Sequence, residues 1–541
     1  MLLTLLFIIA AAWFIFGYYW YGGYLANVFE LDDNNPTPAH SKFDGVDYVP
    51  AHPMVLLGHH FASIAGAGPI VGPIKAAALW GWLPAFLWVT IGSVFFGGVH
   101  DMGAVVASMR HGGLSMGEVI KQWVGPRAKK LFLIFTWLAL VLVIAVFLEL
   151  AAATLAANAA VAFAATMYIL FALIFGYMVY RWNISLGIAT LIMVPLVFLA
   201  VIVGVYMPSV ANLFQFNVMT WKWILIAYIF LASVLPVWIL LQPRDYLSSW
   251  LLYVSVFIGG VGMIFGPKFM ADVKETLPAF KGFTPADGKY LWPLLFITIA
   301  CGAISGFHSL VGSGTTSKQI DKESHARMIG YGGMLLEGIV ATIAIGTVIM
   351  TGGKFTNPLA TFGDGIGKFA TLFGIPHSVG MAIGLLALNS FILTSLDTAT
   401  RLARYQFQEF FDGKVDRYTA SIIGIVFATI LVFSKATDAA GNPIPMWKVI
   451  WPVFGSANQL VAGLALLGLG VWVIRGLKKN AAFAMYPMVF MMITTITALG
   501  ILVVDTWKTS KVLSITATLL IILALWLAYE AYLVLHGKEA A

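Results

Sequence analysis

The sequence predicts an all-α polytopic membrane protein with about 15 transmembrane helices, and its composition and the length of its apolar runs support this class. Of the 541 residues, 60% are hydrophobic and only 10% are charged, and the mean hydropathy is +0.91. So few charges cannot cover a water-soluble globule of this size. Apolar runs of about 20 residues recur along the chain and lack the alternation of membrane strands, so the expected spans are helices.

Short clusters of charged residues, glycine and proline separate the expected helices. No segment between them much exceeds about 25 residues, so no soluble catalytic domain is expected and any activity lies within the membrane. The expected helices cover about residues 3–26, 53–80, 83–108, 131–156, 159–180, 184–207, 223–243, 249–267, 290–316, 329–351, 376–400, 418–434, 446–474, 483–504 and 512–535.

The basic residues predict the topology. A net charge of +7 would suit nucleic acid, but the basic residues are scattered between apolar runs and form no stripe, so no nucleic-acid partner is expected. If the segment around residues 110–130 is cytoplasmic, every arginine falls on the cytoplasmic side, as the positive-inside rule requires. The N-terminus is then outside and the C-terminus inside. The single cysteine, Cys301, excludes an intrachain disulfide framework.

Two short segments resemble each other. "FASIAGAGP" (61–69) and "FHSLVGSGT" (307–315) share an aromatic residue, serine and two glycines at identical spacing. They lie in the second and ninth expected helices, and this odd offset places them in opposite orientation. The pattern is typical of an inverted repeat whose equivalent helices are both interrupted, and it predicts breaks at Gly66–Pro69 and Gly312–Thr315.

An interrupted helix in the bilayer is tolerated where its backbone lines a cavity or meets a bound solute. The amide groups that start the outer half-helix, around residues 67–72, suit an anionic group, and freed carbonyl groups suit a cation. The alternative is that the glycines and prolines only kink and pack helices, as they commonly do in membranes.

Longer stretches of the chain resemble the carbon starvation (CstA) family of transporters. The matching segments are "GHHFASIAGAGPIVGP" (58–73), "GSVFFGGVHDMGAVVASMRHGGLSMGEV" (92–119), "LPVWILLQPRDYLSSWLL" (235–252), "SGFHSLVGSGTTSKQ" (305–319), "LTSLDTATRLARYQFQE" (393–409) and "WPVFGSANQLVAG" (451–463). The resemblance implies a LeuT-like five-plus-five inverted repeat, with broken helices at about 53–80 and 290–316. It also implies uptake of pyruvate or small peptides by proton symport at the inner membrane.

The resemblance divides the chain into five parts. They are an extra N-terminal helix and cytoplasmic loop (1–52), a first inverted repeat (53–207), two inserted helices and an outer loop (208–289), a second inverted repeat (290–474) and two C-terminal peripheral helices (475–541).

The candidate substrate-binding residues surround the two expected breaks. They are Ser63, Gly66, Ala67, Gly68, Gly72, Lys75, Ser305, His308, Ser309 and Gly312. Lys75 lies inside an expected span, so it is a candidate counter-ion or proton carrier. Its alternative is a lysine that reaches the outer surface, since Trp80 and Trp82 mark the interface nearby.

The candidates for ion or proton coupling are ionisable or hydroxyl residues within the expected helices. They are His59, His60, Lys75, His100, Asp101, Glu149, Thr394, Ser395 and Asp397. Histidines and carboxylates near one cavity could relay protons, whereas hydroxyl groups on the eleventh helix would suit sodium in relatives of this fold. A structural hydrogen bond is the alternative for each. We expect the Arg244/Asp245 and Arg401/Arg404 pairs at the cytoplasmic surface, where they would anchor loops.

A secondary transporter, not an enzyme, is therefore the leading hypothesis. No GxxxxGK[ST] nucleotide-binding loop is present, so an ion gradient must supply the energy. The expected partners are a small substrate, H⁺ (or Na⁺) and the lipid bilayer; no cofactor and no resident metal are expected, and the oligomeric state is open. The alternatives are a sodium-coupled carrier, a haem- or metal-binding redox protein that uses the membrane histidines, and a channel.

Overall fold

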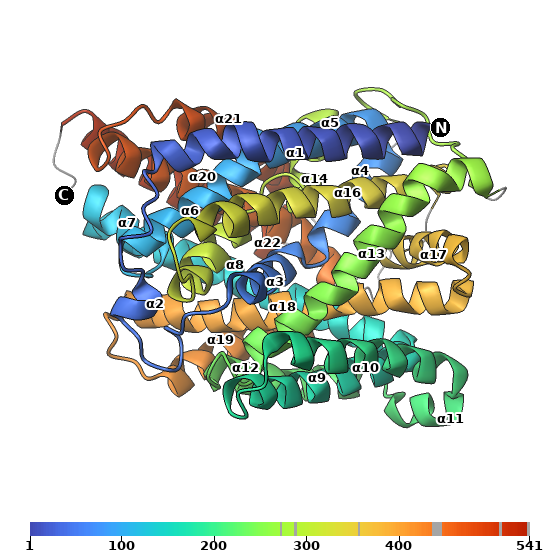
Figure 1. Cartoon of the computed structure of the whole chain (residues 1–541). Helices are drawn as coiled ribbons and strands as arrows, with labels where there is room; N and C mark the ends of the chain where they lie inside the picture. The colour runs from blue at the N-terminus through green and yellow to red at the C-terminus, as the bar shows by residue number, and fades with distance from the viewer. Residues whose placement is uncertain (271–272, 286–288, 355–356, 435–445, 508–510, 538–541) are drawn as a thin grey trace.

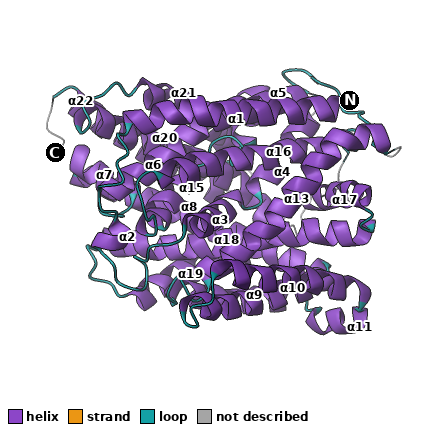
Figure 2. Cartoon of the chain, in the orientation of Figure 1, coloured by secondary structure: helices purple, strands orange, loops and turns teal. Residues whose placement is uncertain are grey.

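The computed structural model describes residues 1–541 except 271–272, 286–288, 355–356, 435–445, 508–510 and 538–541. The described residues form helices and loops and contain no strand (Figure 2). Most long helices lie side by side in one bundle, with the N-terminus at one end and the C-terminus at the other (Figure 1). We call these the α17 end, where α11 and α17 lie, and the α7 end, where α2 and α7 lie.

The helices of the first half are α1 (Leu2–Val28), α2 (Pro38–Ser41), α3 (Pro53–Ala65), α4 (Gly68–Trp80), α5 (Trp82–Gly92), η1 (Ser93–Gly97), α6 (Gly98–Arg110), α7 (Met116–Trp123), α8 (Pro126–Ala157), α9 (Ala159–Tyr180), α10 (Leu186–Tyr206), α11 (Pro208–Ala211), η2 (Asn212–Phe214), α12 (Val218–Val234) and α13 (Leu241–Phe269).

The helices of the second half are α14 (Leu291–Thr298), α15 (Gly306–Gly314), η3 (Thr316–Lys318), η4 (Arg327–Tyr331), α16 (Gly332–Met350), α17 (Pro358–Ala370), η5 (Thr371–Phe373), α18 (His377–Phe410), α19 (Arg417–Phe433), α20 (Met446–Arg475), α21 (Ala482–Thr506) and α22 (Lys511–Leu535).

Among the described residues, 11 helices are long and apolar enough to cross a membrane, or up to 13 if each bent pair is one span. This finding confirms the all-helical membrane class. Every expected span overlaps a helix or a group of consecutive helices, although the span expected at 223–243 runs past the end of α12 into the start of α13, and the total of about 15 crossings stays a prediction. The sequence analysis missed α17, a 13-residue helix that packs along α18 and is too short to cross a bilayer.

The first predicted break is present. Helices α3 and α4 meet at a bend of 42°, and Gly66 between them has φ 41° and ψ −152°, a conformation that favours glycine. Pro69 then lies in the first turn of α4, where its missing N–H leaves no helical bond unmade.

The second predicted break lies elsewhere. Gly312 is inside helix α15, and the interruption is the non-helical segment 299–305 between α14 and α15. The repeated glycines therefore have different roles in the two segments. A Cβ on Gly312 would lie 3.0 Å from Val105 Cγ2 of α6, so this glycine allows close packing of two helices.

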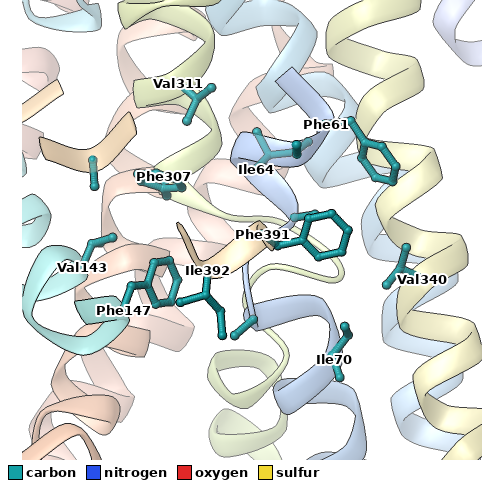
Figure 3. Close-up of a cluster of buried hydrophobic side chains, with 14 of the residues drawn as sticks. Phe61, Ile64, Ile70, Val143, Phe147, Phe307, Val311, Val340, Phe391 and Ile392 are labelled. Atoms are coloured by element: carbon teal, nitrogen blue, oxygen red, sulfur yellow. The ribbon is translucent and has the colours of Figure 1, made fainter. Parts of the chain in front are cut away.

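Apolar side chains fill the space around the first break. Figure 3 shows Phe61 and Ile64 of α3, Ile70 of α4, Phe147 of α8 and Ile392 of α18 gathered there. All are buried. The centre of the bundle is therefore closed near the break, and access from either end has to come from separate cavities.

Candidate functional site

The two interrupted helices touch each other at their breaks. A Cβ on Gly72 of α4 would lie 2.4 Å from the carbonyl oxygen of Thr298, and one on Gly68 would lie 2.4 Å from Cys301 Sγ. These two glycines were predicted to bind substrate, but the structure places them in the contact between α4 and the α14–α15 break. Their missing side chains let the two backbones approach.

Hydroxyl groups of α18 hold the first break. Ser395 Oγ donates to the carbonyl oxygen of Ser63 at 2.8 Å, and the Ser63 hydroxyl lies 3.1 Å from Thr398 Oγ1. Thr394 Oγ1 instead donates to the carbonyl oxygen of Ser390, one turn earlier in its own helix. Ser395 therefore meets the broken helix, as the prediction of a coupling role requires, whereas Thr394 has the local bond that was its alternative.

Asn458 of α20 holds the second break. Its Oδ1 accepts from the backbone N–H of Phe307 at 2.8 Å, and its Nδ2 donates to Ser305 Oγ at 2.9 Å. On the other side, Trp88 Nε1 donates to the carbonyl oxygen of Ile299 at 3.2 Å. Side chains from two other helices thus satisfy backbone groups that the interruption leaves without helical partners.

A buried chain of charged residues lies beside the first break, and we call it the His59 chain: His59, Asp245, Arg244 and Asp397. His59 Nδ1 of α3 lies 2.5 Å from Asp245 Oδ2 of α13, and Arg244 Nη2 donates to Asp245 Oδ1 at 2.7 Å. The Arg244 guanidinium also pairs with Asp397 of α18, and the Tyr228 hydroxyl donates to Asp397 Oδ2 at 2.7 Å. The chain therefore joins three helices.

The prediction that Arg244 and Asp245 lie at the surface is wrong, because both are fully buried. Helix α13 begins at Leu241, eight residues before the expected span, and this brings the pair inside the bundle. Burial of these charges is possible because each has an oppositely charged neighbour.

A second buried cluster, the His308 cluster, consists of His100, Asp101, His308 and Glu337. Asp101 of α6 holds both histidines: its Oδ1 lies 2.8 Å from His100 Nδ1, and its Oδ2 lies 2.8 Å from His308 Nδ1 of α15. On the other side of the ring, His308 Nε2 lies 3.2 Å from Glu337 Oε2 of α16, without the alignment of a hydrogen bond. Three predicted site residues thus meet, together with Glu337.

Other predicted site residues lie outside the two buried clusters. His60 Nδ1 lies 2.8 Å from Thr316 Oγ1, and Ser309 Oγ donates to the carbonyl oxygen of Gly306 at 2.7 Å. Glu149 of α8 pairs with Lys222 of α12 at 2.6 Å, apart from both buried clusters. Ala67 is buried and caps α4, with its carbonyl oxygen accepting from Val71 N at 2.9 Å.

Two cavities lie at opposite ends of the bundle. The α17-end cavity has a volume of about 280 Å³ and is lined by Val71, Leu150, Ala153, Thr154, Ala157, Asn158, Asn357, Pro358, Leu359, Ala360, Met381, Leu385 and Trp451. The α7-end cavity has a volume of about 400 Å³ and is lined by Asp47, Tyr48, Leu114, Glu118, Lys129, Lys318, Tyr405, Gln408, Glu409, Asp412 and Gly413.

Helix α18 lines both cavities. Leu385 belongs to the α17-end cavity and Tyr405 to the α7-end cavity. These positions are about 30 Å apart along a helix axis, close to the thickness of the hydrocarbon core. The residues between them on α18 are buried. The two cavities are therefore separated by the buried residues of α18 between Leu385 and Tyr405.

Lys75 lies near the α17-end cavity. It is half-buried on α4, one turn after the lining residue Val71, and its Nζ lies 5.3 Å from the ring centroid of Trp451, which also lines the cavity. A positive charge thus stands beside this cavity, whose described lining residues include no carboxylate.

The α7-end cavity is bordered by an anchored loop. Asp47, in the loop before α3, accepts from Arg401 Nη1 at 2.8 Å and pairs with Arg404 Nη2 at 3.3 Å. Burial alone would raise the pKa of Asp47, but the two guanidinium groups outweigh burial and lower this pKa to about 2. Both arginines anchor this loop, as expected, although they are buried and not at the surface.

Sequence reasoning missed Arg244 and Asp245 as members of the buried clusters. Glu337 lies within the expected span 329–351, and a carboxylate at such depth is a functional candidate in membranes. Nothing in the local sequence of Arg244 reveals its contact with Asp397, because the two residues are 153 positions apart.

Comparison with known proteins agrees with this architecture. The family model described as "Carbon starvation protein CstA" matches residues 3–357 and 351–498. The peptide transporter CstA of Campylobacter jejuni is 33% identical, over 89% of this chain and 78% of its own. The pyruvate/proton symporter BtsT of Escherichia coli is 31% identical, over 90% of this chain and 80% of its own.

A solved structure shares the fold. The manganese transporter of Eremococcus coleocola matches with a TM-score of 0.52 at 13% identity, over 91% of this chain and 99% of its own. At this identity the likeness shows the LeuT-like fold alone. The relatives are transporters, which confirms the expectation of a multi-pass transporter and not an enzyme. With a family model that matches most of its length, the chain belongs to the carbon starvation protein CstA family.

Proposed function

We propose that the chain is a secondary active transporter of the inner membrane that imports a small carboxylate such as pyruvate by proton symport with alternating access. The observation that carries this proposal is the pair of cavities at opposite ends of α18, separated by a closed centre where the two broken helices touch. A carrier needs access from each side in turn and never from both at once.

The α17-end cavity favours a small anion. Lys75 stands beside it, and no described lining residue is a carboxylate that could hold a substrate amino group. A monocarboxylate needs one good cationic partner, and Lys75 beside this cavity is the candidate for it. The name of the relative BtsT, a pyruvate/proton symporter, agrees with this choice.

Short peptides are the second candidate substrate. The α7-end cavity is lined by carboxylates, including Glu118 and Glu409, and by the lysines Lys129 and Lys318. Such a mixture suits a zwitterion with separate amino and carboxylate ends. Several relatives are named as peptide transporters, among them those of Campylobacter jejuni and Escherichia coli.

The His59 chain supports proton coupling. His59 lies on the first broken helix, contacts Asp245 of α13, and has its Nε2 3.3 Å from Thr315 Oγ1 at the end of α15. A proton on this imidazole would therefore change the contacts of the first broken helix with α13 and with the second broken helix. The sodium-coupled alternative depends on Ser395, whose hydroxyl donates to the carbonyl oxygen of Ser63 at the first break.

The decisive experiment is uptake into proteoliposomes that contain the full chain. Labelled pyruvate and a labelled dipeptide are each offered under a proton gradient alone and under a sodium gradient alone. We expect pyruvate to accumulate under the proton gradient and to leak out when a protonophore is added. Accumulation under sodium alone would overturn proton coupling, and accumulation of the dipeptide alone would overturn the carboxylate substrate.

A further inference from the structure

We propose that Cys301, His308 and Glu337 form a binding site for a divalent transition-metal ion of the Zn²⁺ class. Cys301 belongs to the segment between α14 and α15, His308 to α15 and Glu337 to α16. One possible ligand atom from each residue lies within 4.8 Å of the others, and all three side chains are buried. Thiolate, imidazole and carboxylate are the ligand types that zinc takes in proteins.

Glu337 is the observation that points to a ligand. Its side chain has no exposed surface, and neither of its carboxylate oxygens has a hydrogen-bond partner. A buried carboxylate without hydrogen bonds is strongly disfavoured. His308 Nε2 also lacks a hydrogen bond, although it lies 3.2 Å from Glu337 Oε2. A cation bound between them would satisfy both atoms.

The spacing suits a tetrahedral ion. With zinc-to-ligand distances of about 2.0 Å for nitrogen and oxygen and about 2.3 Å for sulfur, tetrahedral ligand atoms lie about 3.3 Å apart for a nitrogen–oxygen pair and about 3.5 Å for a nitrogen–sulfur pair. The His308–Glu337 separation of 3.2 Å is close to the first of these values. All three ligand atoms lie within 4.8 Å of one another, so Cys301 Sγ would have to approach each of the other two by about 1.3 Å at most.

Neighbouring residues orient the ligands. Asp101 Oδ2 lies 2.8 Å from His308 Nδ1, so a proton on Nδ1 leaves Nε2 with a free lone pair that faces Glu337. A carboxylate behind a metal-binding histidine is the usual arrangement of such sites. Asn458 Nδ2 lies 3.8 Å from Cys301 Sγ and Ser305 Oγ lies 3.5 Å from it, so polar groups also surround the sulfur.

Binding would balance the local charge. The Cys301 thiol would lose its proton to solvent on binding, and the thiolate and the Glu337 carboxylate together would neutralise a divalent ion. The ion would tie α16 to the segment 299–305 at the point where Cys301 Sγ packs against Gly68 of α4. We infer that it stabilises the contact between the two breaks. This site goes beyond the transport reaction and differs from the expectation, made from sequence, of no resident metal.

The test uses the full chain purified in detergent. After chelator treatment it is titrated with Co²⁺, and a thiolate-to-cobalt charge-transfer band is expected. Because Cys301 is the only cysteine of the chain, such a band reports this site alone. Zn²⁺ should abolish the band by displacement, and metal analysis after dialysis against buffered Zn²⁺ should give one ion per chain.

Variants locate the ligands. Cys301→Ser and Glu337→Gln should each weaken Zn²⁺ binding at least about 100-fold, and Asp101→Asn, which removes the group behind His308, about 10- to 100-fold. The control is His377→Gln, an exposed histidine of α18 outside the cluster, which should bind as the unaltered chain does. No cobalt–thiolate band in the unaltered chain, or undiminished zinc binding in folded Cys301→Ser, would overturn the site. Neither outcome bears on pyruvate uptake.

Discussion

His59 Nδ1 of α3 lies 2.5 Å from Asp245 Oδ2 of α13, with both side chains fully buried. This contact ties the first broken helix to α13, a helix that the sequence analysis predicts to lie outside both repeats. Asp245 is in turn held by Arg244, which also pairs with Asp397 of α18. A change of protonation at His59 would therefore reach three helices through directly paired side chains.

Removing the proton site at His59 should uncouple transport. His59→Gln retains a hydrogen-bonding side chain but cannot carry a proton, so we expect gradient-driven uptake to fall at least about tenfold while counterflow exchange of labelled substrate persists. The measurement compares both assays in proteoliposomes. The control is His40→Gln, at a half-exposed histidine paired with Asp321. Full accumulation by His59→Gln would remove this histidine from coupling.

Lys75 should set the affinity for substrate. Loss of a hydrogen bond to a charged group costs about 1.5–3 kcal/mol, so Lys75→Ala should raise KM for pyruvate about 10- to 100-fold. The measurement is the initial uptake rate as a function of substrate concentration. Lys268→Ala removes an exposed lysine near the same end of the bundle and should leave KM unchanged. An unaltered KM in Lys75→Ala would assign this lysine to the membrane surface.

Asp47 should make the stability of the fold depend on acid pH. Its pKa is lowered from the usual 3.8 to about 2 by Arg401 and Arg404, against the opposite effect of burial. The unfolded chain therefore binds this proton more readily than the folded one, so the ion pairs stabilise the fold fully above about pH 4. This contribution, about 2 kcal/mol, is lost as the pH falls from about 4 to about 2.

The check is thermal unfolding of Asp47→Asn and of the unaltered chain at several pH values. The variant should be less stable by several kcal/mol at pH 7, because two buried guanidinium groups lose their carboxylate, and the gap should narrow in acid. Asp364→Asn, at a partly exposed carboxylate of α17, is the control. A stability difference that does not vary between pH 5 and pH 2 would contradict the assignment.

The contact between the two breaks should not tolerate an added methyl group. A Cβ on Gly72 would lie 2.4 Å from the backbone oxygen of Thr298, which cannot rotate away, so Gly72→Ala should destabilise the fold by about 1–3 kcal/mol. The matched control is Gly187→Ala in α10, where no atom lies within 4 Å of the new Cβ. The control should be neutral or slightly stabilised, since alanine favours helix. Equal unfolding temperatures for the two variants would show that the break can relax.

Hydropathy was sufficient to predict most of the long helices, because crossing a bilayer demands long apolar runs. The position of the second break was not predictable from the matched motifs, since the same small residues serve as a break at Gly66 and as helix-packing positions at Gly312 and Gly314. Helix α17 was missed because its 13 residues cannot span the bilayer and its apolar stripe is short.

The candidate site was predicted in part. His59, Asp101, His308 and Ser395 were candidates because ionisable and hydroxyl residues within membrane helices can carry protons or bind ions, and the structure gives each a partner from another helix. Most of the partner residues could not be predicted from the sequence. Pairs such as His59 with Asp245 join residues 186 positions apart. From the sequence alone, a charged residue such as Asp245 is expected in a loop at the membrane surface.

Helix α18 continues without interruption past both cavities. Bending this buried helix would leave backbone groups without hydrogen-bond partners, each at a cost of several kcal/mol, so α18 suits the role of a rigid element. The moving parts would then be the two broken helices, α3–α4 and α14–α15. At their breaks, side chains of Ser395, Asn458 and Trp88 already form hydrogen bonds with backbone groups. If these three hydrogen bonds were exchanged for others, each broken helix could change its angle at the break while every backbone group there kept a hydrogen-bond partner.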